Sequence, residues 1–260
     1  MILDELAAHA RERVAAARAR VPLEEIRAQA EALPRGDFRF EKAIAGKGTA
    51  FICEIKKASP SRGVIDPQFD YIGIAGQYEE AGADCISVLT EPKWFLGSDD
   101  IFRAVRLTVD APMLRKDFTV DAYQIYEARV LGADAVLLIC ALLDTDTLRE
   151  YLAICDQLGL SALVETHDEA EMQSAVAAGA RLIGVNNRNL RDFSVDLGNA
   201  ARLRAGAPEG TIFVSESGVS CPEDAAKLRQ AGADAILVGE HLMRSPDKQG
   251  ALQALREAAK

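Results

Sequence analysis

The sequence from residue 51 to residue 63 reads Phe51-Ile52-Cys53-Glu54-Ile55-Lys56-Lys57-Ala58-Ser59-Pro60-Ser61-Arg62-Gly63. It begins as a short apolar run that is typical of a β-strand and then places Glu54 and Lys56 two residues apart. Because side chains alternate along a strand, these two point to the same side. A buried carboxylate and ammonium are costly unless they are paired or used in chemistry. The stretch therefore indicates either an ion pair inside a barrel or part of a functional site.

From this stretch onward the chain repeats one unit, a helix-like segment that ends in Gly-Ala-Asp or a close variant and is followed by an apolar run. The clearest copies are 81–84 before 85–89, 131–134 before 135–139, 178–181 before 182–185, and 231–234 before 235–238. The glycine suits a helix C-terminus, where a left-handed residue is needed. Continuous apolar runs are expected of parallel strands that are buried on both faces.

The spacing of these copies leaves room for two strand–helix units in each interval, which gives eight strands in all. We expect the strands near residues 51–56, 85–89, 112–116, 135–140, 161–165, 182–186, 211–216 and 235–238. Helices are expected between them, for example over 122–131, 144–158 and 169–178. This pattern predicts an α/β fold, a (β/α)8 TIM barrel. A doubly wound open sheet is the alternative, but the GxGxxG turn after its first strand is missing.

The segment before the first strand has a different composition. Residues 3–32 are rich in Ala, Arg, Glu and Leu and contain no glycine, which predicts one or two amphipathic helices broken near Val21-Pro22. A connecting stretch of roughly ten residues follows. We therefore expect residues 1–260 to form a single barrel domain, with a helical extension over 1–48 and the barrel over 49–260.

Composition excludes several classes of protein. The net charge of −10 argues against a nucleic-acid surface, which needs a basic patch. The N-terminus lacks a signal-peptide pattern, and the longest apolar run, 135–143, falls short of the roughly 20 residues that span a bilayer. Five scattered cysteines and three distant histidines form no metal or redox motif. We expect a cytoplasmic protein with a small-molecule ligand, no membrane or nucleic-acid partner and no bound metal.

Ionisable residues recur where the expected strands end. The active site of such a barrel lies at the C-terminal ends of its strands. The polar residues there are Glu54, Lys56, Ser59, Thr90, Glu91, Lys116, Asp117, Glu165, Thr166, Asn186, Asn187, Arg188, Asn189, Ser215, Glu216, Ser217, Gly239 and Glu240. Any one of them alone is best interpreted as a solvated loop residue, but the set supplies a general acid and a general base. For a lysine near another cation and apolar walls, we expect the charged form to be disfavoured.

Two features predict what the site binds. Ser217-Gly218 and Gly239-Glu240 follow the seventh and eighth strands, where barrels often hold phosphate on exposed main-chain N–H groups. Ser59 adds a hydroxyl group from the first loop. Apolar side chains are near in sequence, and core packing is their default interpretation: Trp94, Phe95, Phe118, Leu137, Leu190 and Phe193. Trp94-Phe95 is the least core-like pair, so a flat apolar ligand group is expected to rest there.

These residues resemble the indole-3-glycerol phosphate synthase family of tryptophan biosynthesis. The resemblance rests on motifs in the family's order: Glu54-Ile55-Lys56-Lys57-Ala58-Ser59-Pro60-Ser61, Ser87-Val88-Leu89-Thr90-Glu91, Phe95-Leu96-Gly97-Ser98, Leu114-Arg115-Lys116-Asp117-Phe118, Val164-Glu165, Gly184-Val185-Asn186-Asn187-Arg188-Asn189-Leu190 and Ser215-Glu216-Ser217-Gly218-Val219. It covers nearly the whole chain, including the N-terminal extension. The glycine repeats alone are weak evidence, whereas the first-strand motif with Lys116 and Glu165 in register is specific.

The resemblance implies a reaction and its site. The family converts 1-(2-carboxyphenylamino)-1-deoxyribulose 5-phosphate to indole-3-glycerol phosphate, CO₂ and water without a metal or organic cofactor. By resemblance, Lys116 is the general acid, Glu165 the general base of dehydration, and Lys56 the partner of the substrate carboxylate, with the order in which the lysines act left open. The other site residues implied are Glu54 and Asn186 as orienting groups, Arg188, Glu216 and Ser217 as further polar contacts, Ser59, Gly218, Gly239 and Glu240 at the phosphate, and Phe95, Phe118, Leu137 and Leu190 around the aromatic ring.

The resemblance leaves some questions open. Glu240 stands where the family commonly has a small hydroxyl residue, so its carboxylate must point away from phosphate, and Arg181 replaces an acidic residue of the repeat. Another sugar-phosphate barrel, such as an isomerase, fits the phosphate loops but not Glu54 with both lysines. A Schiff-base aldolase or a catalytically silent phosphate-ligand binder are further alternatives. We expect a monomer, with weak association to other enzymes of the pathway, and an N-terminal helix that either covers the barrel mouth or serves as an oligomerisation arm.

Overall fold

The computed structural model describes residues 2–46, 48–190 and 192–260, and its centre is a closed barrel of eight parallel strands. The strands are β1 (Ala50–Ile55), β4 (Cys85–Leu89), β5 (Met113–Lys116), β6 (Ala135–Ile139), β7 (Ser161–Thr166), β8 (Leu182–Asn186), β9 (Ile212–Glu216) and β10 (Ala235–Val238). Around the barrel they are ordered β1-β10-β9-β8-β7-β6-β5-β4. The predicted (β/α)8 barrel is confirmed, and each predicted strand agrees with an observed one to within one residue at either end.

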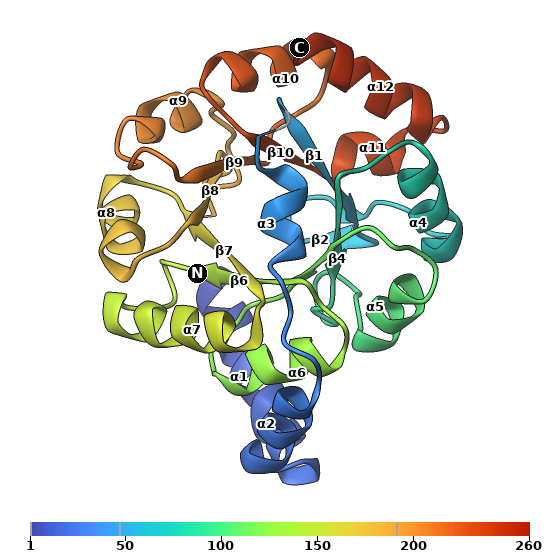
Figure 1. Ribbon diagram of the computed structural model, residues 1–260. Coiled ribbons are helices and arrows are strands. Elements are labelled where there is room, and N and C mark those ends of the chain that lie inside the picture. Colours follow the sequence, from blue (N-terminus) through green and yellow to red (C-terminus); the bar gives the residue numbers. More distant parts are fainter. Residues whose placement is uncertain (1, 47, 191) are drawn as a thin grey trace.

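Helices surround the barrel on its outer side (Figure 1). They are α4 (Tyr71–Glu80), α5 (Asp99–Arg106), α6 (Tyr123–Val130), α7 (Thr145–Leu158), α8 (Glu169–Ala178), α9 (Gly198–Arg204), α10 (Pro222–Gln230), α11 (Glu240–Arg244) and α12 (Lys248–Ala258). Gly82, Gly132, Gly179 and Gly232 have φ angles of +79°, +87°, +93° and +88°. The left-handed conformation predicted for the glycine of each repeat is thus confirmed.

The aspartate of the repeat fixes the start of a neighbouring strand. Asp84 accepts a hydrogen bond from the main-chain N–H of Phe51 at 2.8 Å. Asp134 and Asp234 do the same near the starts of β5 and β9, at 2.9 and 2.8 Å. Arg181 replaces this residue in one copy, and its guanidinium instead pairs with Glu41 of helix α3 (Arg39–Ile44) at 3.3 Å and with Asp156 of α7 at 2.8 Å.

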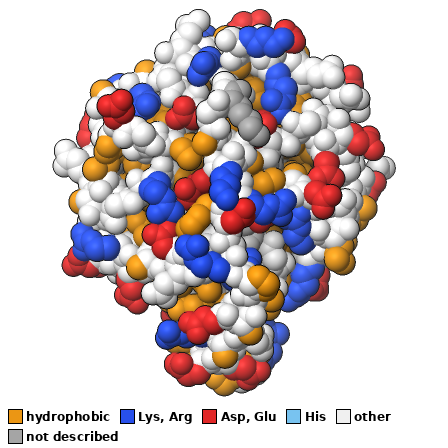
Figure 2. Space-filling view, in the orientation of Figure 1, with side chains coloured by type: hydrophobic (Ala, Val, Ile, Leu, Met, Phe, Trp, Pro, Cys, Tyr) orange, Lys and Arg blue, Asp and Glu red, His pale blue; other side chains and the backbone are white. Residues whose placement is uncertain are grey.

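A short helix closes the N-terminal end of the barrel, where the sequence had predicted only a connecting stretch. Helix α3 (Arg39–Ile44) lies across this opening (Figure 1) and buries Phe40 and Ile44 completely against inward-facing side chains of the strands. Figure 2 shows the same face, on which acidic and basic side chains are interspersed. A helix of six residues has too little intrinsic stability to be recognised from sequence, because its stability comes from tertiary packing.

The loop after β1 also contains structure that was not predicted. Residues Ala58–Ser59 (β2) and Gly63–Val64 (β3) form a two-residue antiparallel pair at the C-terminal end of the barrel. This hairpin holds the Ser-Pro-Ser-Arg segment beside the barrel mouth.

The N-terminal extension consists of α1 (Ile2–Arg20) and α2 (Leu23–Ala32), so the predicted break near Val21-Pro22 is confirmed. Helix α2 packs against α6, and α1 lies on the far side of the barrel from α3 (Figure 1). Arg13 of α1 makes a bidentate ion pair with Asp117, which follows β5. Its Nη1 and Nη2 atoms donate to Oδ2 and Oδ1 of the carboxylate at 3.0 and 2.6 Å. Among the described residues, no helix is both long and apolar enough to cross a membrane.

The packing of α3 predicts the cost of truncating it. Phe40→Ala should lower the free energy of unfolding by about 3–5 kcal/mol, because it opens a cavity in the closed base of the barrel. Urea unfolding of the purified variant measures this loss. Leu107→Ala is the control, since that side chain is 90% exposed and should change stability little. Equal unfolding midpoints for the two variants would show that α3 does not close the core.

Candidate active site

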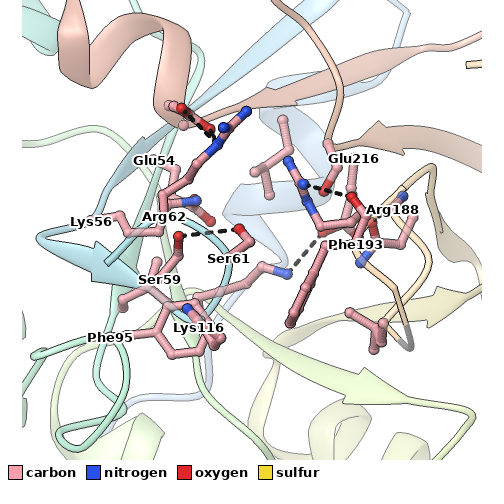
Figure 3. Close-up of a pocket in the computed structure, with 18 of the residues that line it drawn as sticks. Glu54, Lys56, Ser59, Ser61, Arg62, Phe95, Lys116, Arg188, Phe193 and Glu216 are labelled. Atoms are coloured by element: carbon pink, nitrogen blue, oxygen red, sulfur yellow. Dashed lines mark hydrogen bonds and ion pairs between the residues drawn. The ribbon is translucent and has the colours of Figure 1, made fainter. Parts of the chain in front are cut away.

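A cavity of about 510 Å³ opens at the C-terminal ends of the strands (Figure 3). The structure places every site residue implied by the family resemblance along its wall: Glu54, Lys56, Ser59, Phe95, Lys116, Phe118, Leu137, Glu165, Asn186, Arg188, Leu190, Glu216, Ser217, Gly218, Gly239 and Glu240. Of the other polar residues at the strand ends, Asp117 also lines the cavity, whereas Thr90, Glu91, Thr166, Asn187, Asn189 and Ser215 do not. Within the described ranges, no group of three His, Cys, Asp or Glu residues is arranged to hold a metal ion.

Strand register explains why the charged residues meet. Lys116 lies beside Leu89, Glu165 beside Gly184, and Asn186 beside Glu216 in adjacent strands. Because alternate residues face the barrel interior, side chains at matching register positions form a layer. The outermost inward-facing layer of this barrel is therefore polar, whereas the layers beneath it are apolar.

Lys116 lies at the centre of this layer. Its Nζ atom is 2.9 Å from Oε2 of Glu216 and 3.1 Å from Oε2 of Glu165, and its side chain is 13% exposed. Burial lowers the pKa of this ammonium, but the charges of Glu216, Glu165 and Glu54 outweigh burial and raise its pKa above the ordinary value. The expectation that the charged form is disfavoured was wrong, because the neighbours of this lysine are carboxylates.

The pKa values of the two carboxylates beside Lys116 are shifted in opposite directions. Burial raises the pKa of Glu165, but Lys116, His167 and a hydrogen bond from Asn186 outweigh it, so its pKa is lowered. Burial and the charge of Glu165 raise the pKa of Glu216 to about 7 despite the attraction of Lys116. Two neighbouring carboxylates with separated pKa values can act as one base and one proton reservoir.

Glycines make room for these side chains. A Cβ atom at Gly184 would lie 2.2 Å from Oε1 of Glu216, and one at Gly239 would lie 2.4 Å from Oε1 of Glu54. Glu54 in turn accepts a hydrogen bond from Lys56 at 2.5 Å. The ion pair suggested by the sequence is therefore real, and it lies on the cavity wall rather than deep in the barrel.

One end of the cavity is rich in hydrogen-bond donors. Ser59 and Ser61 lie 3.4 Å apart through their hydroxyl oxygens, opposite Ser217-Gly218, which has left-handed φ angles of +67° and +94°. The Glu240 carboxylate turns aside to Arg62 at 3.3 Å and Arg244 at 3.0 Å. The sequence analysis assigned neither arginine to the site, although a basic residue in the first loop was a visible signal.

The other end of the cavity is apolar. The rings of Phe95 and Phe118 have centroids 6.0 Å apart, and Leu137 and Leu190 also line the cavity. Trp94 does not line the cavity, which corrects the expectation for Trp94-Phe95. Its ring contacts His9, because the buried Glu91 accepts the main-chain N–H groups of residues 93 to 95 and fixes the loop around itself.

Further residues complete the cavity that sequence reasoning did not assign to it. Ile2, Leu3 and Leu6 of α1 lie over its mouth, and Phe193 lies on the wall beside Arg188, which donates to its carbonyl oxygen at 3.1 Å. Phe193 had been noted only as a default core residue. The apolar residues of α1 gave no signal of their own, since any amphipathic helix has such a face.

Comparisons with known proteins agree with this geometry. The sequence pattern of the family "Indole-3-glycerol phosphate synthase" matches residues 3–255. The chain is 55% identical over 260 residues to the indole-3-glycerol phosphate synthase of Ruminiclostridium cellulolyticum, covering 100% of both chains. It is 48% identical to that of Leuconostoc mesenteroides, covering 98% of this chain and 99% of the relative. A solved thiamine phosphate pyrophosphorylase from Pyrococcus furiosus shares the fold alone, with a TM-score of 0.61, 17% identity, and coverage of 81% of this chain and 95% of that chain.

The charge cluster predicts how stability responds to pH when its cation is removed. In Lys116→Met, the folded-state pKa values of the two facing carboxylates rise above their unfolded values. Stability that is present below the unfolded pKa is then lost as pH rises. We expect a loss of about 3–5 kcal/mol against the wild type at pH 8 and a smaller loss at pH 5, measured by urea unfolding. Adding Glu216→Gln should recover part of the loss at pH 8, and a loss independent of pH would contradict this account.

Proposed function

This chain belongs to the indole-3-glycerol phosphate synthase family, and on that premise we propose how its cavity performs the reaction. Its activity is that of indole-3-glycerol-phosphate synthase, a carboxy-lyase of tryptophan biosynthesis. The substrate, 1-(2-carboxyphenylamino)-1-deoxyribulose 5-phosphate, has an anionic phosphate end and a carboxylated aromatic end. The observation that carries the proposal is Lys116, held between Glu165 and Glu216 in a cavity that is lined by both hydroxyl-bearing and apolar side chains.

Lys116 is the general acid of ring closure. As the aromatic carbon attacks the ribulose carbonyl, negative charge develops on the carbonyl oxygen. The ammonium of Lys116 donates a proton to that oxygen and stabilises the charge. The raised pKa keeps Lys116 protonated before reaction, and the developing alkoxide is a strong enough base to take the proton. The cavity wall is buried, so this attraction is stronger than in water.

Glu165 is the base of the later dehydration. Its lowered pKa keeps it ionised at neutral pH and ready to accept a proton. Lys56 holds the substrate carboxylate until CO₂ leaves, and Glu54 fixes the position of Lys56. Asn186 donates to Glu165 at 3.3 Å and thereby orients the base. Glu216, with a pKa of about 7, supports Lys116 and exchanges protons with it.

The phosphate end is formed by Ser59, Gly218, Gly239 and the main-chain N–H of Glu240. Arg62 and Arg244 add positive charge next to it, and the Glu240 carboxylate partly neutralises both. The anthranilate ring rests against Phe95, Phe118, Leu137 and Leu190, with Arg188 beside them. Position 218 requires glycine, since its φ angle is left-handed and a Cβ there would lie 2.6 Å from Val195.

The extension and the barrel act as one domain in this proposal, because α1 contributes Ile2, Leu3 and Leu6 to the lining of the cavity. The buried residues Leu3 and Leu6 of α1 face the chain's own barrel, which favours a monomer over an oligomerisation arm. A cytoplasmic location and weak association with other enzymes of the pathway belong to the same proposal.

A fluorescence assay tests the function. Purified protein is mixed with the substrate in EDTA, and the emission of the indole product is followed. Lys116→Ala should lower kcat by at least about 10²- to 10⁴-fold, the usual contribution of a general acid, while substrate still binds. Glu165→Gln should slow a late step and let an intermediate accumulate. Undiminished turnover by Lys116→Ala would refute the acid assignment, and borohydride trapping of a covalent adduct would favour an aldolase.

The ion pairs of Glu240 predict a change in KM. Arg62→Met should raise KM for the substrate by about threefold to tenfold with little change in kcat, because a partly exposed cation is lost from the phosphate end. Glu240→Gln should lower KM, since it removes a carboxylate that competes for the arginines. Arg149→Met, at an exposed arginine on α7, is the control and should leave KM unchanged. Equal KM values for all variants would place the phosphate elsewhere.

A further inference from the structure

His167 lies directly after β7 and has no part in the reaction as described above. Its ring is held between two carboxylates: Nδ1 is 3.0 Å from Oε2 of Glu171 on α8, and Nε2 is 3.4 Å from Oε1 of Glu165. The side chain is 17% exposed. It does not line the cavity. It contacts Oε1 of Glu165, whereas Lys116 contacts Oε2 of the same carboxylate.

The Glu171 carboxylate determines the protonation of Nδ1 of this ring. Oε2 of Glu171 also accepts the main-chain N–H of His167 at 2.8 Å. A carboxylate accepts only, so Nδ1 must carry a proton. Nε2 lies at ion-pair distance from Oε1 of Glu165 and has no hydrogen-bond partner of its own, although it is buried. A proton on Nε2 would make the ring a cation beside this carboxylate.

The surrounding charges favour a proton on this nitrogen. Burial lowers the pKa of His167, but the hydrogen bond to Glu171 and the charges of Glu165, Glu171 and Glu216 outweigh it, so its pKa is raised. The pKa of Glu165 is lowered by Lys116 and, after it, by His167, which outweigh burial. The thiol of Cys140 stays neutral, because burial raises its pKa. Both the 3.4 Å contact and these charges favour an imidazolium beside Glu165.

We infer that His167 is a positioning residue for the proposed base: its imidazolium, held by Glu171, keeps the Glu165 carboxylate charged and turned toward the cavity. The segment is anchored from a third element, since Asn199 of α9 donates to the carbonyl oxygens of both His167 and Asn186, at 3.1 and 3.3 Å. Loss of the ring proton at alkaline pH removes a positive charge from beside Glu165. This inference rests on the proposed role of Glu165 in catalysis.

The first measurement follows the ring itself and does not depend on activity. Nuclear magnetic resonance titration of the imidazole signals resolves three histidines, and His167→Gln identifies the one of interest. We expect the pKa of His167 to lie above its ordinary value and to fall in Glu171→Gln. Glu169→Gln makes the same charge change on an exposed residue of α8 and should leave it unchanged. An unaltered His167 titration in Glu171→Gln would overturn the inference.

The second measurement is the pH profile of kcat. Glu171→Gln should shift the alkaline limb of the profile to lower pH. The size of this shift should equal the decrease in the pKa of His167 that the titration measures in the same variant. In His167→Gln, whose amide is uncharged and does not titrate, that limb should disappear. His167→Leu should lower neutral kcat by about tenfold. The ionisation of Glu216 also falls in this range, but a limb due to Glu216 would persist in His167→Gln and would overturn the inference.

The two readouts separate this inference from the proposed function. A wild-type protein without turnover in the indole assay would refute the function. The titration would still test whether the carboxylates of Glu171 and Glu165 raise the pKa of His167. An active wild type whose profile stays the same in His167→Gln would refute the positioning role alone.

Discussion

A buried ammonium without partners would be too costly for a folded protein, and Lys116 shows how this barrel meets that constraint. Its charge is matched by Glu165 and Glu216 on strands across the barrel, and Glu54 adds a more distant negative charge. Each partner needs the others: without the cation, two carboxylates would face one another at short range. The same mutual dependence separates the pKa values of Glu165 and Glu216, and that separation is what general acid–base chemistry needs.

The rest of the structure holds the cluster of Lys116, Glu165 and Glu216 at the wall of one cavity. Helix α3 closes the base of the barrel with Phe40 and Ile44, and α1 covers the mouth with Leu3 and Leu6. The ion pair of Arg13 with Asp117 ties α1 to the strand that carries Lys116. Burial at both ends strengthens the electrostatic interactions between them, because fewer waters screen the charges.

Two adjacent residues of β5 have different partners because neighbouring side chains on a strand point to opposite faces. Arg115 points outward and pairs with Asp99 and Glu127 in the helical layer, whereas Lys116 points into the cavity. A shift of one residue in register would exchange the two cations and destroy both networks. Gly184 and Gly239 are equally constrained, since any Cβ at these positions would collide with Glu216 or Glu54.

The repeating architecture and the composition of the polar layer could be predicted from the amino-acid sequence. Apolar runs, the Gly-Ala-Asp repeats and the period-two placement of Glu54 and Lys56 are local signals, because hydrophobic and hydrogen-bonding demands act on neighbouring residues. The pKa shifts of these residues and the identity of their contact partners follow from the folded barrel and could not be predicted. The high pKa of Lys116, the sideways turn of Glu240 to Arg62, the exclusion of Trp94 and the place of His167 between two carboxylates all depend on residues far apart in the chain. Electrostatic and packing interactions act through space, so they are fixed only when the barrel closes.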